Sequence, residues 1–244
     1  MDQQRLHRLL APRSLAFVGG REAEVAIGQC LTLGFDGDLW PVHHRRDKVA
    51  GLPAFASVED LPAPPDAVLV AVNRWATVET VGRLAALGTG AAVCYASGFA
   101  EVGAAGAELQ NALVAAADGM PVIGPNCYGT VAATVGAALW PDQHGLRRVD
   151  RGVALVTQSG NIALNLTLQT RPMAISHVLT LGNQADVGIE ECVEALLDDP
   201  SVSSIGLHLE ALRDVGRFET ACRRDRKSVG EGKSVKRGGR RITN

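Results

Sequence analysis

The sequence is poor in aromatic residues, and over most of its length it has almost no lysine. Only 4% of its 244 residues are Phe, Trp or Tyr, and Lys48 is the single lysine between residues 1 and 225. No run of 18 apolar residues occurs, although a membrane-spanning helix needs about that many. The N-terminus, MDQQRLHRLL, also lacks the apolar core of a signal peptide. These absences predict a cytoplasmic protein without a membrane partner.

Closely spaced cysteines are missing as well. Cys30, Cys94, Cys127, Cys192 and Cys222 are far apart, whereas zinc sites and redox motifs use close pairs. We therefore expect reduced thiols and no metal site. Cys127 stands in a glycine-containing turn and is either a reactive thiol or a small residue tolerated there. The absence of a nearby histidine in the sequence favours the second interpretation.

Acidic and basic residues are unevenly divided along the chain. Residues 1–225 carry 17 Lys and Arg against 25 Asp and Glu, whereas residues 226–244 carry 7 against 1. The terminal string RKSVGEGKSVKRGGRRITN has no aromatic residue among its charges, which argues against a nucleic-acid-binding arm. We predict that 226–244 is a disordered tail foreign to the rest of the protein, and that nucleic acid is not a partner.

Short, β-branched apolar runs are the main structural signal that is present. They alternate with segments of helical spacing, which is typical of an α/β fold with a parallel sheet buried on both faces. In residues 1–145 we predict a doubly wound, Rossmann-like domain, followed by a linker over 137–151. Its strands are expected at 15–18, 38–42, 67–72, 91–96 and 121–124, and its helices at 25–33, 78–87 and 107–117.

A second alternation occupies residues 146–225. It predicts strands at 152–157, 175–181 and 203–210 and helices that end near 170, 197 and 223. Three βα units make an incomplete flavodoxin-like domain, so we expect a three-stranded parallel sheet with an exposed edge.

Glycine-containing turns follow several of these strands, and their order along the chain resembles a known family. The motifs are L-A-P-R-S-L-A-F-V-G-G, S-G-F-A-E-V-G, G-P-N-C-Y-G, T-Q-S-G-N and L-G-N-Q-A-D-V, within residues 9–224. In this respect the chain resembles the NDP-forming acyl-CoA synthetases, also called ADP-forming acetate–CoA ligases, which are related to the succinyl-CoA synthetase α subunit. The resemblance implies a CoA-binding domain followed by a succinyl-CoA ligase-like domain.

Two features of the first domain suit a phosphorylated nucleotide. Gly19, Gly20 and Arg21 lie between a strand and a helix, where backbone N–H groups can approach an anion; a plain tight turn is the alternative. After the second strand, an NAD-binding unit would have an acid. This chain instead has V-H-H-R-R-D-K, with the candidate residues Val42, His43, Arg45 and Lys48. These cations suit the 3′-phosphate of CoA, although NADP or a solvated basic loop is also compatible.

The resemblance assigns further CoA contacts. Val72 and Asn73 match positions along the pantetheine channel, although the family commonly has V-P-A here and Asn73 departs from it. Positions that contact CoA or border its thiol end correspond to Ser97, Gly98, Pro125 and Asn126.

In the second domain, a strand-to-helix turn contains Gln158, Ser159, Gly160 and Asn161. Backbone amides and the helix dipole bind phosphate at such a turn, and in the family a phosphohistidine docks there. A plain N-cap serine is the alternative. By resemblance, Glu210 matches the catalytic glutamate that orients this histidine.

The resemblance implies a parent ligase that converts a carboxylic acid, CoA and ATP into acyl-CoA, ADP and phosphate through an acyl phosphate and a phosphohistidine. The family's histidine lies in a motif like S-H-T-G, which this sequence does not contain. We therefore expect an inactive CoA-binding fragment, with small carboxylic acids as partners and an oligomeric full-length form. ATP, ADP and Mg²⁺ would be used only through an ATP-grasp domain or subunit.

Two alternative functions remain. One is a CoA-binding regulatory module, such as the ligase-like part of a protein acetyltransferase. The other is an NADP oxidoreductase, which is disfavoured because the sequence shows no catalytic acid–base constellation.

Overall fold

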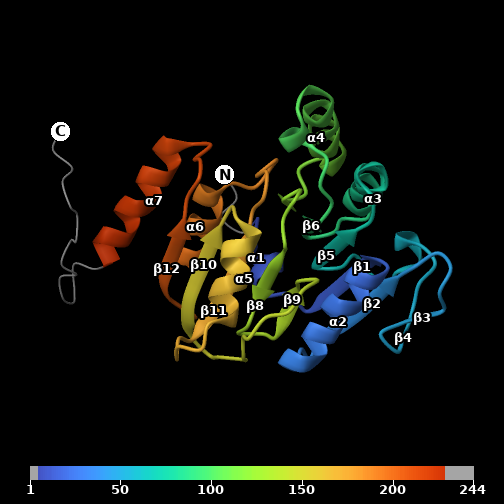
Figure 1. Ribbon diagram of the computed structural model, residues 1–244, viewed down its shortest axis with the longest axis horizontal. Helices are drawn as coiled ribbons and strands as arrows, with labels where there is room; N and C mark the ends of the chain where they lie inside the picture. Colours follow the sequence, from blue (N-terminus) through green and yellow to red (C-terminus); the bar gives the residue numbers. More distant parts are fainter. Residues whose placement is uncertain (1–4, 229–244) are drawn as a thin grey trace.

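The computed structural model describes residues 5–228, which form two α/β units side by side (Figure 1). The first unit has a five-stranded sheet in the order β2-β1-β5-β6-β7, in which every pairing is parallel. Its strands are β1 (Ser14–Gly19), β2 (Asp38–Val42), β5 (Ala67–Ala71), β6 (Ala92–Cys94) and β7 (Val122–Ile123). The predicted Rossmann-like sheet is therefore confirmed, and each strand lies within about two residues of its expected position.

Three helices connect these strands, in the alternation that the sequence predicts. They are α2 (Arg21–Leu33), α3 (Arg74–Ala86) and α4 (Ala104–Ala117). Shorter elements complete the unit: α1 (His7–Leu10), the hairpin of β3 (Lys48–Val49) and β4 (Leu52–Pro53), and the 3-10 helices η1 (Val58–Asp60) and η2 (Ala100–Val102). Each of the three long helices begins three or four residues before the range expected from its apolar spacing.

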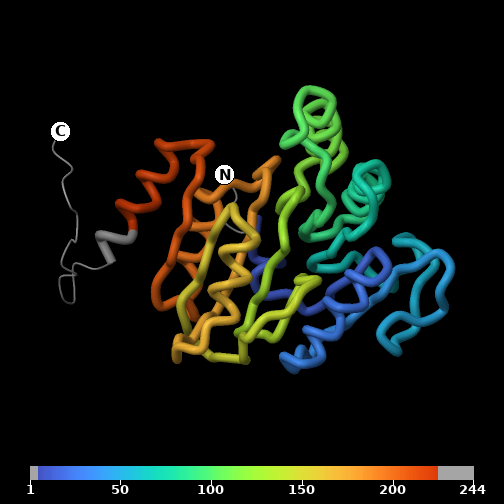
Figure 2. The backbone as a smooth tube through the Cα atoms, in the orientation of Figure 1, coloured from blue at the N-terminus to red at the C-terminus, as the bar shows by residue number. Residues whose placement is uncertain are grey.

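The second unit is built on a mixed sheet in the order β12-β10-β11-β8-β9. Its parallel strands are β10 (Gly152–Thr157), β11 (Ile175–Thr180) and β12 (Val202–His208). The expected three-stranded sheet is wrong, because β8 (Thr130–Ala132) pairs antiparallel with β11, and β9 (Ala137–Leu139) pairs antiparallel with β8. The segment predicted as a linker over 137–151 thus begins as a buried strand. Figure 2 shows this yellow-green segment crossing from one unit to the other.

The outer strand of this unit agrees with the expected exposed edge, whereas its last helix differs from expectation. Strand β12 is partly exposed, with Ser203, Ser204 and Leu207 open to solvent, because β10 is its only partner within the described residues. The helices are α5 (Gly160–Leu168), α6 (Ile189–Leu197) and α7 (Val215–Ser228). Because α7 continues to Ser228, the expected disordered tail does not start at 226. The rest of that prediction, for 229–244, lies outside the described residues.

One hydrophobic core runs through both units. It contains Leu15 and Phe17 of β1 as well as Val178 and Leu179 of β11. At the junction α2 packs on β9, where the buried Cys30 thiol accepts the N–H of Ala138 at 3.2 Å. The two units therefore pack directly against each other through shared buried apolar side chains. No helix within residues 5–228 has the length and apolar character to cross a membrane.

Asp66 anchors the chain before the first strand. Its carboxylate accepts hydrogen bonds from Arg8 Nε and the Arg13 N–H, both at 2.8 Å, and from the Ser14 N–H at 3.3 Å. Burial alone would raise the pKa of Asp66, but these donors outweigh it and lower the pKa below its ordinary value. The interaction therefore stabilises the fold when Asp66 is ionised.

We predict that Asp66→Asn lowers the free energy of unfolding by about 1–3 kcal/mol at pH 7, because three donors lose a charged acceptor. A depressed folded-state pKa contributes stability above the unfolded-state pKa that is lost as pH falls through the folded value. The difference between the two proteins should therefore shrink below about pH 4. Urea unfolding at several pH values measures it, with Glu108→Gln at an exposed site as control. A difference that does not change with pH would contradict this role.

Candidate functional site

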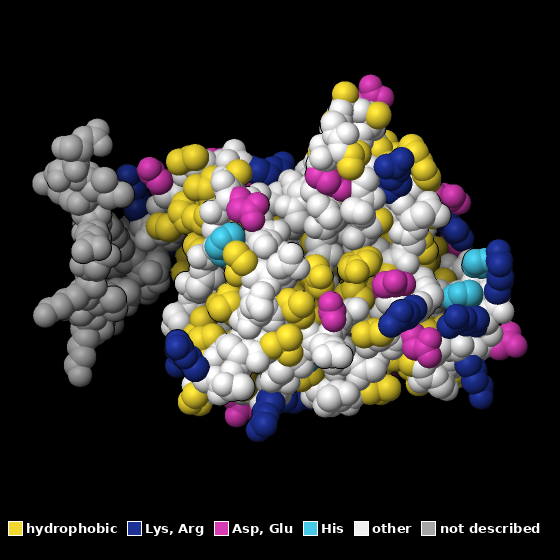
Figure 3. Space-filling view, in the orientation of Figure 1, with side chains coloured by type: hydrophobic (Ala, Val, Ile, Leu, Met, Phe, Trp, Pro, Cys, Tyr) yellow, Lys and Arg dark blue, Asp and Glu magenta, His cyan; other side chains and the backbone are white. Residues whose placement is uncertain are grey.

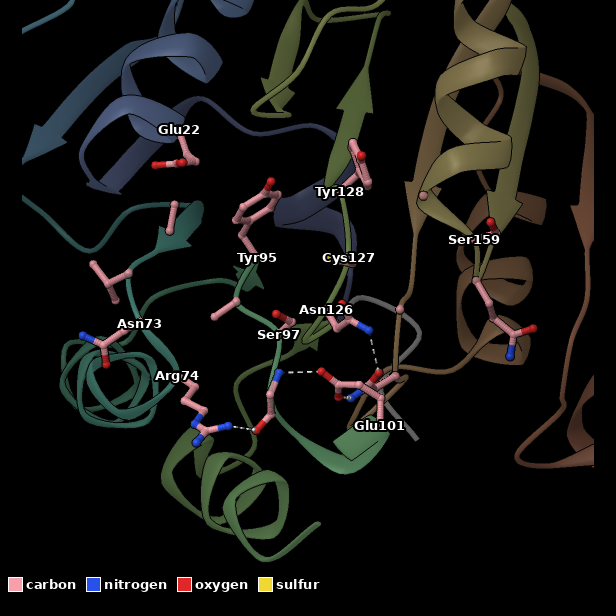
Figure 4. A pocket seen from close by; sticks show the side chains of 18 of the residues that line it. Glu22, Asn73, Arg74, Tyr95, Ser97, Glu101, Asn126, Cys127, Tyr128 and Ser159 are labelled. Atoms are coloured by element: carbon pink, nitrogen blue, oxygen red, sulfur yellow. Dashed lines mark hydrogen bonds between the residues drawn. The ribbon is translucent and has the colours of Figure 1, made fainter. Parts of the chain in front are cut away.

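A cleft of about 1080 Å³ lies between the two units, at the carboxyl ends of their parallel strands (Figure 4). Loops after β5, β6, β7, β10, β11 and β12 all contribute to it, as expected for ligand sites of open α/β sheets. Its walls are formed by Glu22, Ala71, Val72, Asn73, Arg74, Trp75, Tyr95, Ala96, Ser97, Gly98, Glu101, Asn126, Cys127, Tyr128, Gln158, Ser159, Gly160, Asn161, Gly182, Asn183 and Glu210.

A smaller pocket of about 270 Å³ adjoins the cleft at Val72, which lines both. Besides Val72, four of the residues predicted to bind CoA line the small pocket: Gly19, Gly20, Val42 and His43. Five more line the cleft: Val72, Asn73, Ser97, Gly98 and Asn126. The five residues predicted in the second domain, Gln158 to Asn161 and Glu210, line the cleft from the opposite side. The fold thus brings two separate groups of predicted residues to one cavity.

Four predicted residues do not line either cavity: Arg21, Arg45, Lys48 and Pro125. Arg21 is the exposed first residue of α2, and Lys48 is exposed in the β3–β4 hairpin. Arg45 is also exposed. Figure 3 shows Lys, Arg and His side chains gathered over this end of the molecule. The basic cluster predicted from the sequence therefore borders the small pocket, and only its histidines, His43 and His44, form part of the wall.

The turn at Gly19 requires glycine because the neighbouring strand is close. Gly19 has φ of +148°, and a Cβ there would lie 2.5 Å from the carbonyl oxygen of Ala71. His43 faces the same pocket, and its Nδ1 accepts the N–H groups of Arg45 and Arg46 at 3.1 and 3.2 Å. Desolvation and the positive charge of Arg46 lower the pKa of His43. A neutral His43 then has Nε2–H as its remaining donor.

Three side chains hold the loops on the first side of the cleft, and of these only Asn73 was predicted from the sequence as a site residue. Asn73, which departs from the family pattern, caps α3 by accepting the N–H groups of Trp75 and Ala76, each at 3.1 Å. Arg74 Nη1 donates to the Gly98 carbonyl at 3.1 Å. Glu101 accepts the N–H groups of Gly98 and Phe99. The S-G-F-A-E turn is therefore fixed from both sides.

Asn183 joins this turn to the second unit. Its Nδ2 donates to Glu101 and, at 3.0 Å, to Gln110 Oε1, while its Oδ1 accepts from Asn126 Nδ2 at 3.3 Å. Its backbone N–H donates to the Pro125 carbonyl at 3.0 Å, which is the role that Pro125 has in place of lining the cleft. Burial alone would raise the pKa of Glu101, but the Asn183 amide and the backbone donors lower it.

On the second side of the cleft, some residues of the predicted phosphate turn hold the local structure, whereas others have N–H groups that are free within the described residues. Ser159 is the N-cap of α5 and accepts the Ile162 N–H at 3.4 Å. The Gln158 side chain accepts the Ala211 N–H at 3.0 Å and donates to the Ala211 carbonyl at 2.8 Å, so it positions the loop after β12. Within the described residues, the N–H groups of Gly160 and Asn161 have no acceptor, and both residues line the cleft.

Glu210 lies two residues beyond the end of β12 and is exposed at the cleft. His208, at the end of β12, is partly exposed, and its Nδ1 lies 3.3 Å from Thr157 Oγ1. Cys127 is buried, and burial raises the pKa of its thiol to about 12. The interpretation of Cys127 as a small turn residue is therefore favoured over a reactive thiol.

Among the residues described, no three His, Cys, Asp or Glu side chains gather closely enough to hold a metal ion. The cleft residues that sequence reasoning missed include Tyr95, Tyr128, Glu101 and Asn183. All four fall inside or beside the glycine motifs. Polar and aromatic side chains within glycine turns were the sequence signal that could have identified these four residues.

Comparison with known proteins agrees with this division of the chain. Residues 14–133 match the model of a CoA binding domain, and residues 150–229 match that of a succinyl-CoA ligase like flavodoxin domain. A trans-feruloyl-CoA synthase from an unknown prokaryotic organism is 34% identical over 235 residues, which are 91% of this chain and 33% of that protein. The ADP-forming acetate–CoA ligase of Methanocaldococcus jannaschii is 27% identical over 216 residues, 83% of this chain and 29% of that protein.

A solved structure extends the likeness to three dimensions. The dinucleotide forming acetyl-coenzyme A synthetase 1 of Ca. Korarchaeum cryptofilum matches with a TM-score of 0.80 and 27% identity, over 90% of this chain and 49% of that one. The chain thus spans about a third to a half of the proteins that it resembles.

We predict that Asn183→Ala lowers the free energy of unfolding by about 1–2 kcal/mol, because the truncation leaves Glu101, Gln110 and Asn126 without their shared partner. The matched control is Asn165→Ala, whose amide is exposed and bonds only to Asn161 within its own helix. It should change stability by less than about 0.5 kcal/mol. Thermal unfolding of both variants makes the comparison, and equal effects would mean that Asn183 does not join the units.

Proposed function

We propose that this chain, which belongs to the family of NDP-forming acyl-CoA synthetases (ADP-forming acetate–CoA ligases), is the CoA-binding part of an enzyme that forms an acyl-CoA. The single observation that carries the proposal is that the two cavities are neighbours and share Val72 in their walls. The small pocket lies beside a glycine turn, and the cleft on the other side of Val72 reaches the N-terminus of α5.

In this proposal the adenosine and phosphates of CoA occupy the small pocket, beside Gly19, Gly20 and His43. The pantetheine arm passes Val72 and Asn73 into the cleft. Its thiol then lies near Ser97 and Asn126, which are on the same wall. The neutral backbone donors and imidazole of this pocket suit a phosphorylated ribose.

The opposite wall supplies the phosphoryl subsite. The unpartnered N–H groups of Gly160 and Asn161 open the first turn of α5, where the helix dipole favours an anion. Glu210 stands beside them in the same cleft and would accept a hydrogen bond from an imidazole N–H of a phosphohistidine docked there, which raises the basicity of the ring.

The proposed overall reaction joins a carboxylic acid to the CoA thiol. ATP transfers its terminal phosphoryl group, an acyl phosphate forms, and attack of the thiol releases phosphate and leaves a thioester. Within residues 5–228 no histidine lines the cleft. We therefore propose that the phosphohistidine and the ATP-binding residues come from an ATP-grasp domain or subunit and from sequence beyond these two units.

We predict that the chain binds CoA at least about tenfold more tightly than dephospho-CoA, because a charge-assisted hydrogen bond to the 3′-phosphate contributes about 1.5–3 kcal/mol. Isothermal titration calorimetry measures both affinities. His43→Ala should remove most of the difference, whereas Arg21→Ala, which changes an exposed residue outside both cavities, should preserve it.

Equal affinity for CoA and dephospho-CoA would contradict the placement of the 3′-phosphate. Binding of NADP without binding of CoA would contradict the proposed function itself and would favour an oxidoreductase.

We also predict that labelled ATP, or acetyl phosphate with Mg²⁺, leaves no acid-labile phosphate on the isolated chain. The reason is that none of the histidines described lines the cleft: His177 is buried, His144 is half-buried, and the Nδ1 of His208 faces Thr157 Oγ1 at 3.3 Å. Phosphate analysis by mass spectrometry under neutral conditions checks this. Stable label on any histidine would show that the chain carries its own phosphoryl acceptor.

A further inference from the structure

Aromatic side chains are scarce in this protein, and both of its tyrosines lie in the cleft. The sequence has 3 Trp, 2 Tyr and 5 Phe. Both tyrosines, Tyr95 and Tyr128, line the cleft together with Trp75, which is 62% exposed. Tyr95 and Tyr128 are only partly buried and Trp75 is largely exposed, so burial in the core does not account for their place around one cavity.

The two tyrosines are held as a pair. Their ring centroids are 6.5 Å apart at an interplanar angle of 81°, an edge-to-face arrangement that aromatic rings prefer. Behind them, Tyr128 packs on the buried Trp140 with centroids 5.7 Å apart. The Tyr128 ring also covers Gly160, where a Cβ would lie 2.1 Å from Tyr128 Cδ2. The pair is therefore a fixed wall and not a loose surface feature.

The pair also lies where the two proposed ligand subsites meet. In Figure 4, Tyr95 and Tyr128 stand between Asn73 on one side and Ser159 on the other. An acid that is to be joined to CoA must have its carboxylate near both the thiol and the phosphoryl group. The side chains beside that position are the two tyrosines.

Their hydroxyl groups are available to a ligand. Among the described residues, neither Tyr95 nor Tyr128 has a hydrogen-bond partner for its Oη, and neither oxygen is enclosed in the core. Burial, and after it the neighbouring Tyr128 and Glu22, raise the pKa of Tyr95. Tyr95 therefore stays protonated at neutral pH and can donate.

We propose that Tyr95 and Tyr128 form the acyl subsite of the cleft and that this subsite takes a carboxylic acid with a planar aromatic ring. The inference rests on the proposed function, because it places the acid beside CoA. The ring of the acid packs against the tyrosine pair, while its carboxylate faces the N–H groups of Gly160 and Asn161. A polar ring substituent or a carboxylate oxygen accepts from a tyrosine hydroxyl.

The test compares two acids of equal carbon count, benzoate and cyclohexanecarboxylate, on the full chain saturated with CoA. Saturation-transfer NMR and calorimetry give their affinities. We expect benzoate to bind at least fivefold more tightly, because only the planar ring can use the aromatic wall. Equal affinities, tighter binding of the saturated ring, or no binding of either acid would overturn the inference.

Variants locate the binding. Tyr128→Leu should remove the preference for benzoate, and Tyr95→Phe should weaken hydroxyl-dependent binding of 4-hydroxybenzoate while keeping the ring preference. Leu31→Ala, at an exposed apolar residue outside the cleft, should change neither. If Tyr128→Leu does not fold, Tyr128→Phe combined with Tyr95→Phe tests the hydroxyls alone. Unchanged acid affinities in the variants that do fold would overturn the assignment of the wall.

Calorimetry with CoA alone separates this inference from the proposed function. Loss of the benzoate preference with intact CoA affinity contradicts only the acyl subsite. Absence of CoA binding to the unmodified chain contradicts the proposed function as well.

Discussion

The site depends on the direct backbone pairing between the turn after β7 and the turn after β11. The N–H groups of Asn183, Ala185 and Val187 donate to the carbonyls of Pro125, Gly124 and Val122, at 2.9 to 3.2 Å. A ladder of this kind fixes one unit against the other over several residues, so the width of the cleft is set by main-chain geometry. Glycine at 182 is required, because a Cβ there would lie 2.3 Å from the carbonyl oxygens of Pro125 and Asn126.

This pairing explains why motifs separated by many residues form one cavity. The G-P-N-C-Y-G turn supplies Asn126 and Tyr128 to the cleft, and the L-G-N-Q turn supplies Gly182 and Asn183. Asn183 then extends the contact to Glu101 and Gln110 of the first unit. A substitution in either turn is therefore expected to alter both the junction and the candidate site, since the same residues serve both.

Much of the fold could be predicted because the parallel strands are apolar on both faces. Strands such as β10 and β5 need only a short β-branched run, and the residues that follow them were predicted from their place after a strand and from the family resemblance. Strands β8 and β9 could not be identified in this way. Each has three residues, and Ala137–Leu139 shows no alternation of apolar and polar residues. The place of this strand beside β8 therefore depends on the tertiary packing of Cys30 and Ala138.

The basic cluster was predicted from charge, but charge does not say which side chains face the pocket. His43 lines the pocket, whereas Arg45 and Lys48 point to solvent.

The electrostatics of the cleft follow from this arrangement. The acidic residues among its walls are Glu22, Glu101 and Glu210, and Arg74 is the one basic residue there among those described. The charge of Glu101 is directed at the donors of Gly98, Phe99 and Asn183. On the wall formed by the second unit, which has no basic residue among those described, an anionic ligand would be held by backbone N–H groups and by the dipole of α5. Fixed N–H donors discriminate by position more than by net charge, because they point in one direction and cannot follow a misplaced anion. The first turn of α5 therefore selects an anion by its position, and Gly160, Asn161 and Glu210 line the cleft around that place.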